Sequence, residues 1–235
     1  MPGGAARIAG PARIVGAFDL VVFDFDGTLA DSATGIAACL SAAFESYDLQ
    51  PPRFDEVRRR IGLSLEEAIR QLIHDRRDVD INAVAIRYRE LHPTVAAPAT
   101  TLFPGTRETL TTLGAAGIPL ALVSQKARRS LAQVLGQFAI EHCFNLVLGS
   151  DDVTQAKPQA TIYERHIIPV CGDPARDRVL VVGDTDIDLR FAANIGARSC
   201  WAEYGYGHHA SCRALNPAFT IPDIADLPSV CGFAA

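Results

Sequence analysis

Long hydrophobic runs, closely spaced cysteines and dense positive charge are all scarce in this chain of 235 residues. No apolar run approaches the roughly 20 residues that cross a bilayer, so we expect no membrane partner. None of the six cysteines forms a CxxC pair. This spacing gives no sign of a zinc site or a disulfide framework, and we infer a reduced, cytoplasmic setting.

Basic residues are few, and almost all of them are arginine. The net charge is -5, and the only dense basic run is Arg58–Arg60. Nucleic-acid-binding proteins usually have a concentrated basic face, so we expect no nucleic-acid partner. Only Lys126 and Lys157 are lysines among the 22 Lys and Arg residues. Because the other basic residues are arginine, the use of lysine at these two positions favours a role that needs lysine itself.

The composition is that of a folded chain with a sizeable core. Hydrophobic residues make up 49% and the mean hydropathy is +0.14, which argues against disorder. The length suits a large domain with a smaller insert, as a monomer or a homodimer. Residues 1–17 are rich in Gly, Ala and Pro without a continuous apolar stretch, so we interpret them as a tail and not a secretory signal.

Short apolar runs alternate with helical patterns along most of the chain. Runs that are almost wholly apolar fit strands covered on both faces of a parallel sheet. Each run is followed by polar or glycine-containing residues and then by a helix-like segment, which predicts an α/β doubly wound domain. The expected strands are Leu20–Phe25, Ile118–Val123, Phe144–Leu148, Val179–Val182 and Ser199–Ala202.

One interval interrupts this alternation. From Ser32 to Thr101 apolar residues recur at helical spacing, as at Ile36, Leu40 and Phe44, and no convincing strand is found. The interval is too long for an ordinary crossover. We therefore predict a helical insert, residues 32–101, in a sheet domain made of residues 18–31 and 102–235.

Two acidic motifs close expected strands. In the sequence DFDGT, Asp24 and Asp26 lie at the carboxyl end of the first strand, where open α/β sheets build their sites. One carboxylate can act as nucleophile and the other can transfer a proton, while Gly27 lets the backbone approach a phosphate. In GDTDID, Asp184 and Asp188 lie four apart, so a helical start turns both toward one side. Such oxygen ligands suit Mg²⁺.

Structural interpretations of these motifs stay open. An Asp-Gly pair is common in turns, and Asp184 or Asp186 can cap a helix, although capping leaves the other acids unexplained. Ser124 and the amide of the next residue can hold phosphate oxygens, or the serine can simply be a cap. Lys157 can supply a cation to a phosphoryl group or lie on the surface.

These pieces, in this order, resemble the motifs of the haloacid-dehalogenase-like hydrolase superfamily. The segment Asp24–Ser32 resembles the first motif, Ser124 the second, Lys157 the third and Gly183–Asp188 the fourth. The resemblance extends from about Asp19 to Leu227. It implies a Rossmann-like core with a helical cap inserted after the first strand.

Within that superfamily the chain looks like the phosphoglycolate phosphatase group. Two positions depart from the group's pattern: Gln125 stands where Asn usually follows Ser or Thr, and Ala160 replaces the second Pro of the lysine motif. Neither departure removes a catalytic group. Pyrophosphate and sugar phosphates remain alternative substrates. The matching segments are Phe103–Gly105, Gly149–Asp152, Tyr204–Gly207 and Ile221–Asp223.

The resemblance implies Mg²⁺-dependent hydrolysis of a small phosphorylated metabolite such as 2-phosphoglycolate. Asp24 would attack phosphorus and form an aspartyl phosphate, and Asp26 would transfer the protons. The implied metal ligands are Asp24, the backbone carbonyl of Asp26, Asp184 and Asp188. The implied phosphate-binding residues are Gly27, Ser124, Gln125 and Lys157.

The cap offers a candidate for substrate selection. Arg60 and Gly62 lie where related caps place a specificity loop. An arginine there can hold a carboxylate or a second phosphate in a fork, although a solvated helix face also explains it.

Other functions are weighed against the same residues. Phosphoglucomutase-like relatives share all the motifs and differ in product. Dehalogenase relatives generally lack the second acid, which Asp26 supplies here. Phosphonatase relatives need a cap lysine, and no lysine precedes Lys126. A non-enzymatic binding protein would be favoured by a missing acid, and none is missing.

Overall fold

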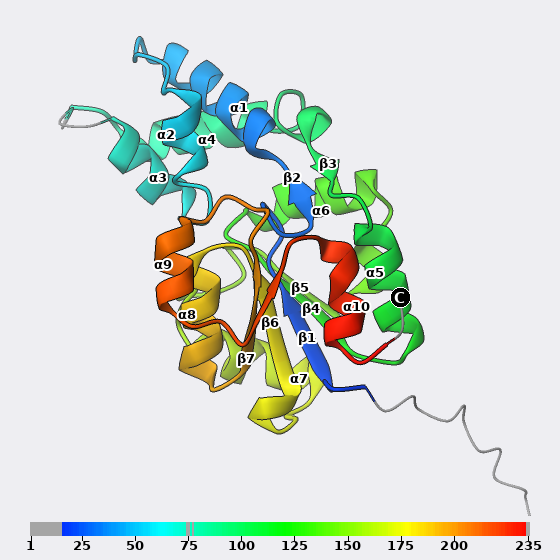
Figure 1. The fold of residues 1–235 in the computed structure, drawn as a ribbon. Coiled ribbons are helices and arrows are strands. Elements are labelled where there is room, and N and C mark those ends of the chain that lie inside the picture. Colours follow the sequence, from blue (N-terminus) through cyan, green and yellow to red (C-terminus); the bar gives the residue numbers. More distant parts are fainter. Residues whose placement is uncertain (1–15, 74–75, 77, 234–235) are drawn as a thin grey trace, which may run out of the picture.

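The structure is a computed structural model that describes residues 16–73, 76 and 78–233. A sheet with flanking helices forms one part, and a group of helices lies at one end of it (Figure 1). We call residues 18–31 and 102–233 the core and residues 32–101 the cap, following the division that the sequence predicts. Residues 1–15 of the expected tail lie outside the described residues.

The core is built on a six-stranded sheet in the order β5-β4-β1-β6-β7-β8. All neighbouring strands are parallel, and Phe23 lies in register with Leu122 and Val182. The carboxyl ends of β1, β4 and β6 therefore meet at one edge of the sheet. The strands are β1 (Leu20–Phe23), β4 (Leu120–Val123), β5 (Leu146–Leu148), β6 (Val179–Gly183), β7 (Arg198–Ala202) and β8 (Phe219–Ile221).

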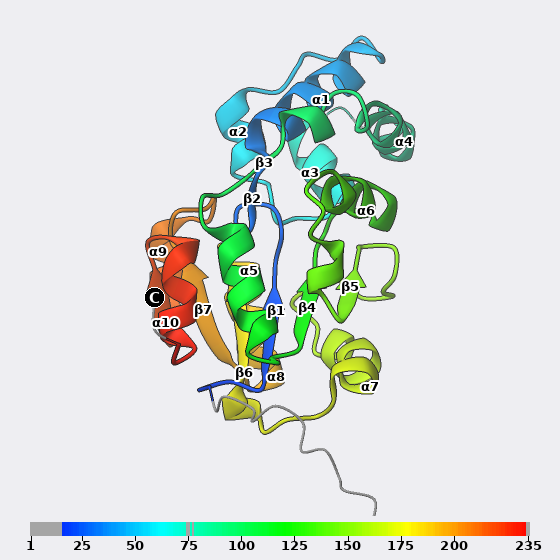
Figure 2. The ribbon, with the colours of Figure 1, turned by 90° about the vertical axis from the view of Figure 1, so that its right-hand side faces the viewer.

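Helices cover both faces of the sheet, as the apolar strands predict. Val21 and Phe23 pack with α5 (Thr106–Ala115), α6 (Arg128–Gln137) and α10 (Leu227–Val230). Leu20 and Val22 pack with α8 (Asp186–Ile195) and with the π-helical turn Tyr163–Ile167, which α7 (Ile168–Cys171) follows. Figure 1 shows α5 and α10 to the right of the sheet and α8 to its left, and Figure 2 looks onto the sheet from the side of α5 and α10. None of the described helices, α9 (His209–Ala214) included, is long and apolar enough to cross a membrane.

The cap has a hydrophobic core of its own. Leu40, Phe44, Ile69 and Val84 are among its buried side chains. An antiparallel pair of two-residue strands, β2 (Ala30–Asp31) and β3 (Thr101–Leu102), joins the cap to the core. The cap helices are α1 (Ala33–Glu45), α2 (Phe54–Arg58), α3 (Leu65–Leu72) and α4 (Ile81–Leu91), followed by the 3₁₀ turn Ala97–Ala99.

The predicted α/β class with a Rossmann-like sheet is confirmed, and a strand overlaps each of the five expected runs. The sequence prediction missed β8 and the short pair β2–β3. The strand β8 has only three residues at the sheet edge, and Thr220 in its centre is exposed. Two- and three-residue strands are too short to show a periodicity of their own.

Candidate active site

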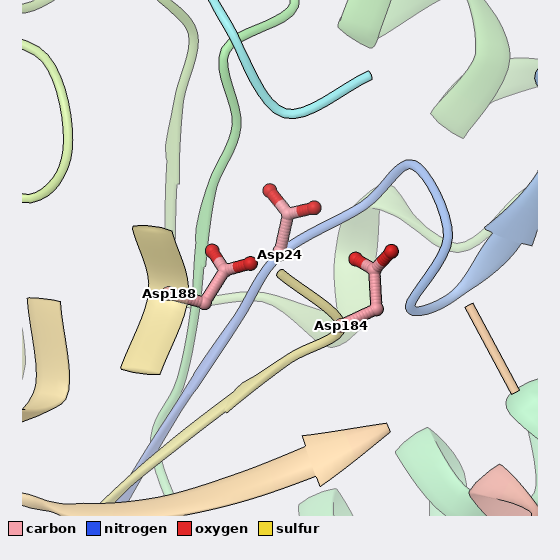
Figure 3. Close-up of side chains that lie close together, drawn as sticks. All are labelled: Asp24, Asp184 and Asp188. Atoms are coloured by element: carbon pink, nitrogen blue, oxygen red, sulfur yellow. The ribbon is translucent and has the colours of Figure 1, made fainter. Parts of the chain in front are cut away.

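Three buried carboxylates converge at the carboxyl edge of the sheet. Figure 3 shows Asp24 after β1, Asp184 after β6 and Asp188 on α8, with all three carboxylates turned to the same side. One oxygen from each lies within 4.8 Å of the others. The sequence prediction that these acids share one site therefore agrees with the geometry.

Asp184 is held by the core on both of its oxygens. Thr28 Oγ1 donates to Oδ1 at 3.1 Å, and the Tyr206 backbone N–H donates to Oδ2 at 2.7 Å. Gly27, at φ +87°, packs directly against this carboxylate, and a side chain there would overlap it. Its own N–H donates to Ala30 at 2.8 Å. Gly27 thus makes room for Asp184, and its predicted approach to a phosphate stays a prediction.

Asp188 is fixed by the start of α8. The Thr185 N–H and hydroxyl both donate to Asp188 Oδ2, at 3.1 and 2.7 Å. Thr185 is the N-cap of this helix, so neither Asp184 nor Asp186 is, as the alternative interpretation had it. Asp186 instead pairs with Arg190 at 3.1 Å on the surface. The first turn of α8 leaves Oδ1 of Asp188 facing the other carboxylates.

Lys157 is the cation of this cluster. Its Nζ lies 2.7 Å from Asp24 Oδ1 and 2.6 Å from Asp188 Oδ1. Its side chain is only 4% exposed, which rules out the surface interpretation. Burial alone would lower the pKa of Lys157, but the carboxylates of Asp188 and Asp24 outweigh it and raise the pKa above its ordinary value.

One lysine does not balance three buried carboxylates. Burial raises the pKa of Asp24 from 3.8 to about 7, with Lys157 opposing and Asp188 adding to the rise. Burial also raises the pKa of Asp184 well above its ordinary value, and the charges of Asp188 and Asp24 add to this. The cluster therefore favours additional positive charge, whether a proton or a cation.

Asp26 lies beside this cluster and not in it. Its Oδ2 is 3.2 Å from Nζ of Lys126, and both side chains are largely buried. Its Oδ1 is buried without a hydrogen-bond partner among the described residues. The Asp26 carboxylate is thus directed away from the metal cluster, so a ligand role for this residue would fall to its backbone carbonyl.

Ser124 ends β4 next to the acidic cluster. Its side chain is buried, its N–H donates to Leu148 O at 3.0 Å, and its Oγ accepts from the Lys126 N–H at 3.1 Å. Gln125 reaches toward the carbonyl of Lys157 at 3.5 Å. Ser124 and Gln125 line one cavity with Asp24 and Asp26.

That cavity lies between the core and the cap and has a volume of about 80 Å³. Arg60 and Gly62 line it from the cap side. Arg60 Nη1 donates to Glu56 O at 2.7 Å, and its Nε is buried without a partner among the described residues. Gly62, at φ +103°, packs against Thr185, so the predicted specificity loop lies over the first turn of α8.

The arginines of the basic run have different surroundings. Arg59 is exposed, whereas Arg58 donates to Gly205 O at 2.8 Å and lies 5.3 Å from the ring centre of Tyr206. The Tyr206 hydroxyl accepts from the N–H groups of Ser32 and Ala33 at 2.8 and 3.1 Å. The loop that holds Asp184 is therefore also the loop that contacts the cap.

Several of these residues escaped sequence reasoning. Thr28 and Thr185 lie inside recognised motifs, where their position next to the acids was a usable signal. Tyr206 was noted only as part of a matching segment, and Lys126 only as one of two lysines. Nothing in the sequence places either beside Asp184 or Asp26, because both contacts join segments far apart in the chain.

The donor set fits Mg²⁺. Three carboxylates with oxygens in mutual reach supply the hard ligands that this ion prefers, and the raised pKa values show a deficit of positive charge. Thr28, Tyr206 and Thr185 fix the orientation of Asp184 and Asp188, as outer residues of metal sites do.

A parallel α/β sheet that gathers buried acids and a lysine beneath a helical cap defines a Rossmann-like hydrolase. A family model described as haloacid dehalogenase-like hydrolase matches residues 21–202, and the chain belongs to this family. Its similarity to the phosphoglycolate phosphatase group is confirmed by curated relatives of that name. The chain is 29% identical to one from Pseudomonas syringae pv. tomato over 218 residues, which cover 90% of this chain and 79% of the relative.

Other relatives agree with this assignment. The phosphoglycolate phosphatase of Pseudomonas putida is 30% identical over 220 residues, covering 90% of this chain and 79% of the relative. Among solved structures, a haloacid dehalogenase-like hydrolase from Bacteroides fragilis matches with a TM-score of 0.80 and 28% identity, covering 89% of this chain and 99% of that one.

The contact between Gly27 and Asp184 is testable by substitution. We expect Gly27→Ala to weaken Mg²⁺ binding roughly 10-fold or more, because the new methyl group displaces Asp184. Gly172→Ala is the matched control, since Gly172 has a similar φ of +83° but open space around it. Isothermal titration calorimetry with Mg²⁺ measures both. Equal affinities in the two variants would contradict the role given to Gly27.

The raised pKa values predict a pH dependence of stability. Between 3.8 and about 7 the folded metal-free protein holds a proton on Asp24 that the unfolded chain releases. Its free energy of unfolding therefore falls as pH rises through this window. We expect the melting temperature in EDTA to fall from about pH 4 to about pH 7, and Mg²⁺ to reduce this slope. A rising melting temperature in EDTA over the same range would refute the account.

Proposed function

We propose that this protein is a Mg²⁺-dependent phosphatase that hydrolyses a small phosphate monoester through an aspartyl phosphate on Asp24. The observation that supports this most strongly is the shared site of Asp24, Asp184, Asp188 and Lys157, which brings a nucleophile and a cation to one point. Membership of a hydrolase family and relatives named phosphoglycolate phosphatase point the same way.

Asp24 is the nucleophile in this proposal. A free oxygen of its carboxylate attacks phosphorus, the bond to the leaving oxygen breaks, and Asp26 gives that oxygen a proton. In the second half, Asp26 takes a proton from water, which attacks phosphorus and restores Asp24. Asp26 suits this role because its carboxylate lines the same cavity as Asp24 without belonging to the metal cluster.

The remaining residues hold and neutralise the phosphoryl group. Ser124, Gln125 and Lys157 would contact its oxygens, since all three lie close to Asp24 around the end of β4. Asp24, the Asp26 carbonyl, Asp184 and Asp188 would hold Mg²⁺. The ion supplies positive charge without which a phosphate dianion is repelled by the carboxylates.

The cap would exclude water and select the substrate. The cavity is small, and Arg60 and Gly62 close it from the cap side. A two-carbon ester such as 2-phosphoglycolate suits this volume, and the buried Arg60 Nε can donate to its carboxylate.

The role of each first-motif acid can be separated by labelling. Asp24→Asn should form no phosphoenzyme, because the attacking oxygen is gone. Asp26→Asn should keep the nucleophile and lose roughly 10²–10⁴-fold in turnover. Rapid-quench labelling with a radioactive phosphate ester checks both, with and without EDTA. Label on Asp24→Asn, or full turnover of the wild type in EDTA that Mg²⁺ does not increase, would sink the mechanism.

Substrate choice calls for a separate measurement. Phosphate release from 2-phosphoglycolate should exceed that from pyrophosphate and hexose phosphates by about 10-fold or more in kcat/KM, because the cavity is too small for a hexose and the planar fork of Arg60 fits a carboxylate. A preference for a hexose phosphate would remove the substrate assignment and leave the phosphatase assignment intact. Isomerised sugar phosphate in place of free phosphate would identify a mutase.

A further inference from the structure

Lys126 has no role in the mechanism above, yet it is the cation nearest to the proposed proton-transfer residue. Its Nζ lies 3.2 Å from Asp26 Oδ2, and the two side chains are 6% and 12% exposed. Both charges of an ion pair buried this deeply lose much of their hydration. That cost is offset only when the ammonium and both carboxylate oxygens have hydrogen-bond partners. Asp26 Oδ1 remains without a partner in the described part of the chain, so the pairing is incomplete.

The charge of Lys126 also faces the cap. Burial lowers the pKa of His92 to about 4, and the Lys126 ammonium acts in the same direction. Burial raises the pKa of Cys39 to about 12, and here Lys126 opposes the rise. Both residues belong to the cap segment, so the field of Lys126 extends from the core into the cap.

The two arginines that line the cavity are partly engaged within the cap, although Arg60 Nε stays free of a partner among the described residues. Arg60 Nη1 donates to the Glu56 carbonyl at 2.7 Å, and Arg89 Nη2 pairs with Glu66 Oε1 at 2.6 Å. Much of the remaining cavity wall is apolar, including Ile36, Leu40, Val57, Ile61 and Leu65. An anionic group brought into this space by the substrate therefore meets Arg60 Nε on the cap side and Lys126 on the core side.

We propose that Lys126 is a second specificity-determining residue, beside Arg60, for substrates that bear a carboxylate next to the phosphate ester. The inference rests on the phosphatase function proposed above. The substrate carboxylate replaces Asp26 as the partner of Lys126, and the Asp26 side chain is thereby released toward the leaving oxygen. A substrate without a carboxylate offers Lys126 no new partner. Asp26 then has to leave the ion pair with Lys126 before it can reach the leaving oxygen, and nothing offsets the cost of breaking that pair.

This exchange predicts different effects of one substitution on two closely matched esters. Ethyl phosphate has the two carbons of 2-phosphoglycolate with a methyl group in place of the carboxylate. Lys126→Met should lower kcat/KM for 2-phosphoglycolate by about 10-fold or more, and should leave or raise kcat/KM for ethyl phosphate. Arg129→Met, which removes an exposed charge three residues further on, should change neither. A fall of equal size for both esters would show that Lys126 only supports the fold, and would overturn the proposal.

A binding measurement tests the proposed exchange of partners at Lys126 in a variant that does not turn over substrate. In an Asp24→Asn background with Mg²⁺, adding Asp26→Asn removes the competitor for Lys126. Calorimetry should then show 2-phosphoglycolate binding several-fold more tightly and ethyl phosphate unchanged. Equal changes for both ligands, or none, would contradict the exchange. Failure of the phosphatase proposal would show separately, as a wild-type protein that releases phosphate from neither ester.

Discussion

The site depends on the cost of holding three carboxylates within 4.8 Å of one another inside the protein. Burial and mutual repulsion both oppose their ionisation, and Lys157 alone does not balance them, as the raised pKa values of Asp24 and Asp184 show. A folded chain tolerates this arrangement because Thr28, Tyr206 and Thr185 donate hydrogen bonds to two of the acids. The remaining deficit of positive charge is what a divalent cation would fill, and a bound phosphate would increase the need for that cation.

The same loop that stabilises the acids also contacts the cap. The backbone of Tyr206 donates to Asp184, while its hydroxyl donates to Asp31 at 2.7 Å and accepts from the start of α1. Arg58 of the cap lies over its ring and donates to Gly205. The position of the cap and the orientation of Asp184 are thus joined through one short segment. A closed cap shields the cluster from water, which strengthens every electrostatic interaction in it.

The sequence was most informative where reactive side chains lie directly at the end of a recognisable strand or at the start of a helix. Apolar runs predicted the central strands, and acids placed directly after them predicted that Asp24 and Asp184 would meet, because parallel strands end at one edge. The four-residue spacing placed Asp188 beside Asp184.

Contacts between distant segments could not be predicted from the sequence. The pairing of Lys126 with Asp26 joins the loops after β1 and β4, and the hydrogen bond from Arg58 to Gly205 joins the cap to the core. Such contacts arise from tertiary packing, which local patterns do not encode. The contact of Gly27 with Asp184 was also out of reach, since the two residues are 157 positions apart in the sequence.

The central claim is that Asp24 takes up the phosphoryl group at a site completed by a divalent cation. The most direct test is a crystal structure grown with Mg²⁺ and beryllium fluoride, which mimics a phosphorylated carboxylate. The account predicts the fluoroberyllate on a carboxylate oxygen of Asp24, with the cation in contact with Asp24 and Asp184 and with Lys157 near the fluorides. Fluoroberyllate on a different side chain, or a cation bound away from these acids, would contradict it.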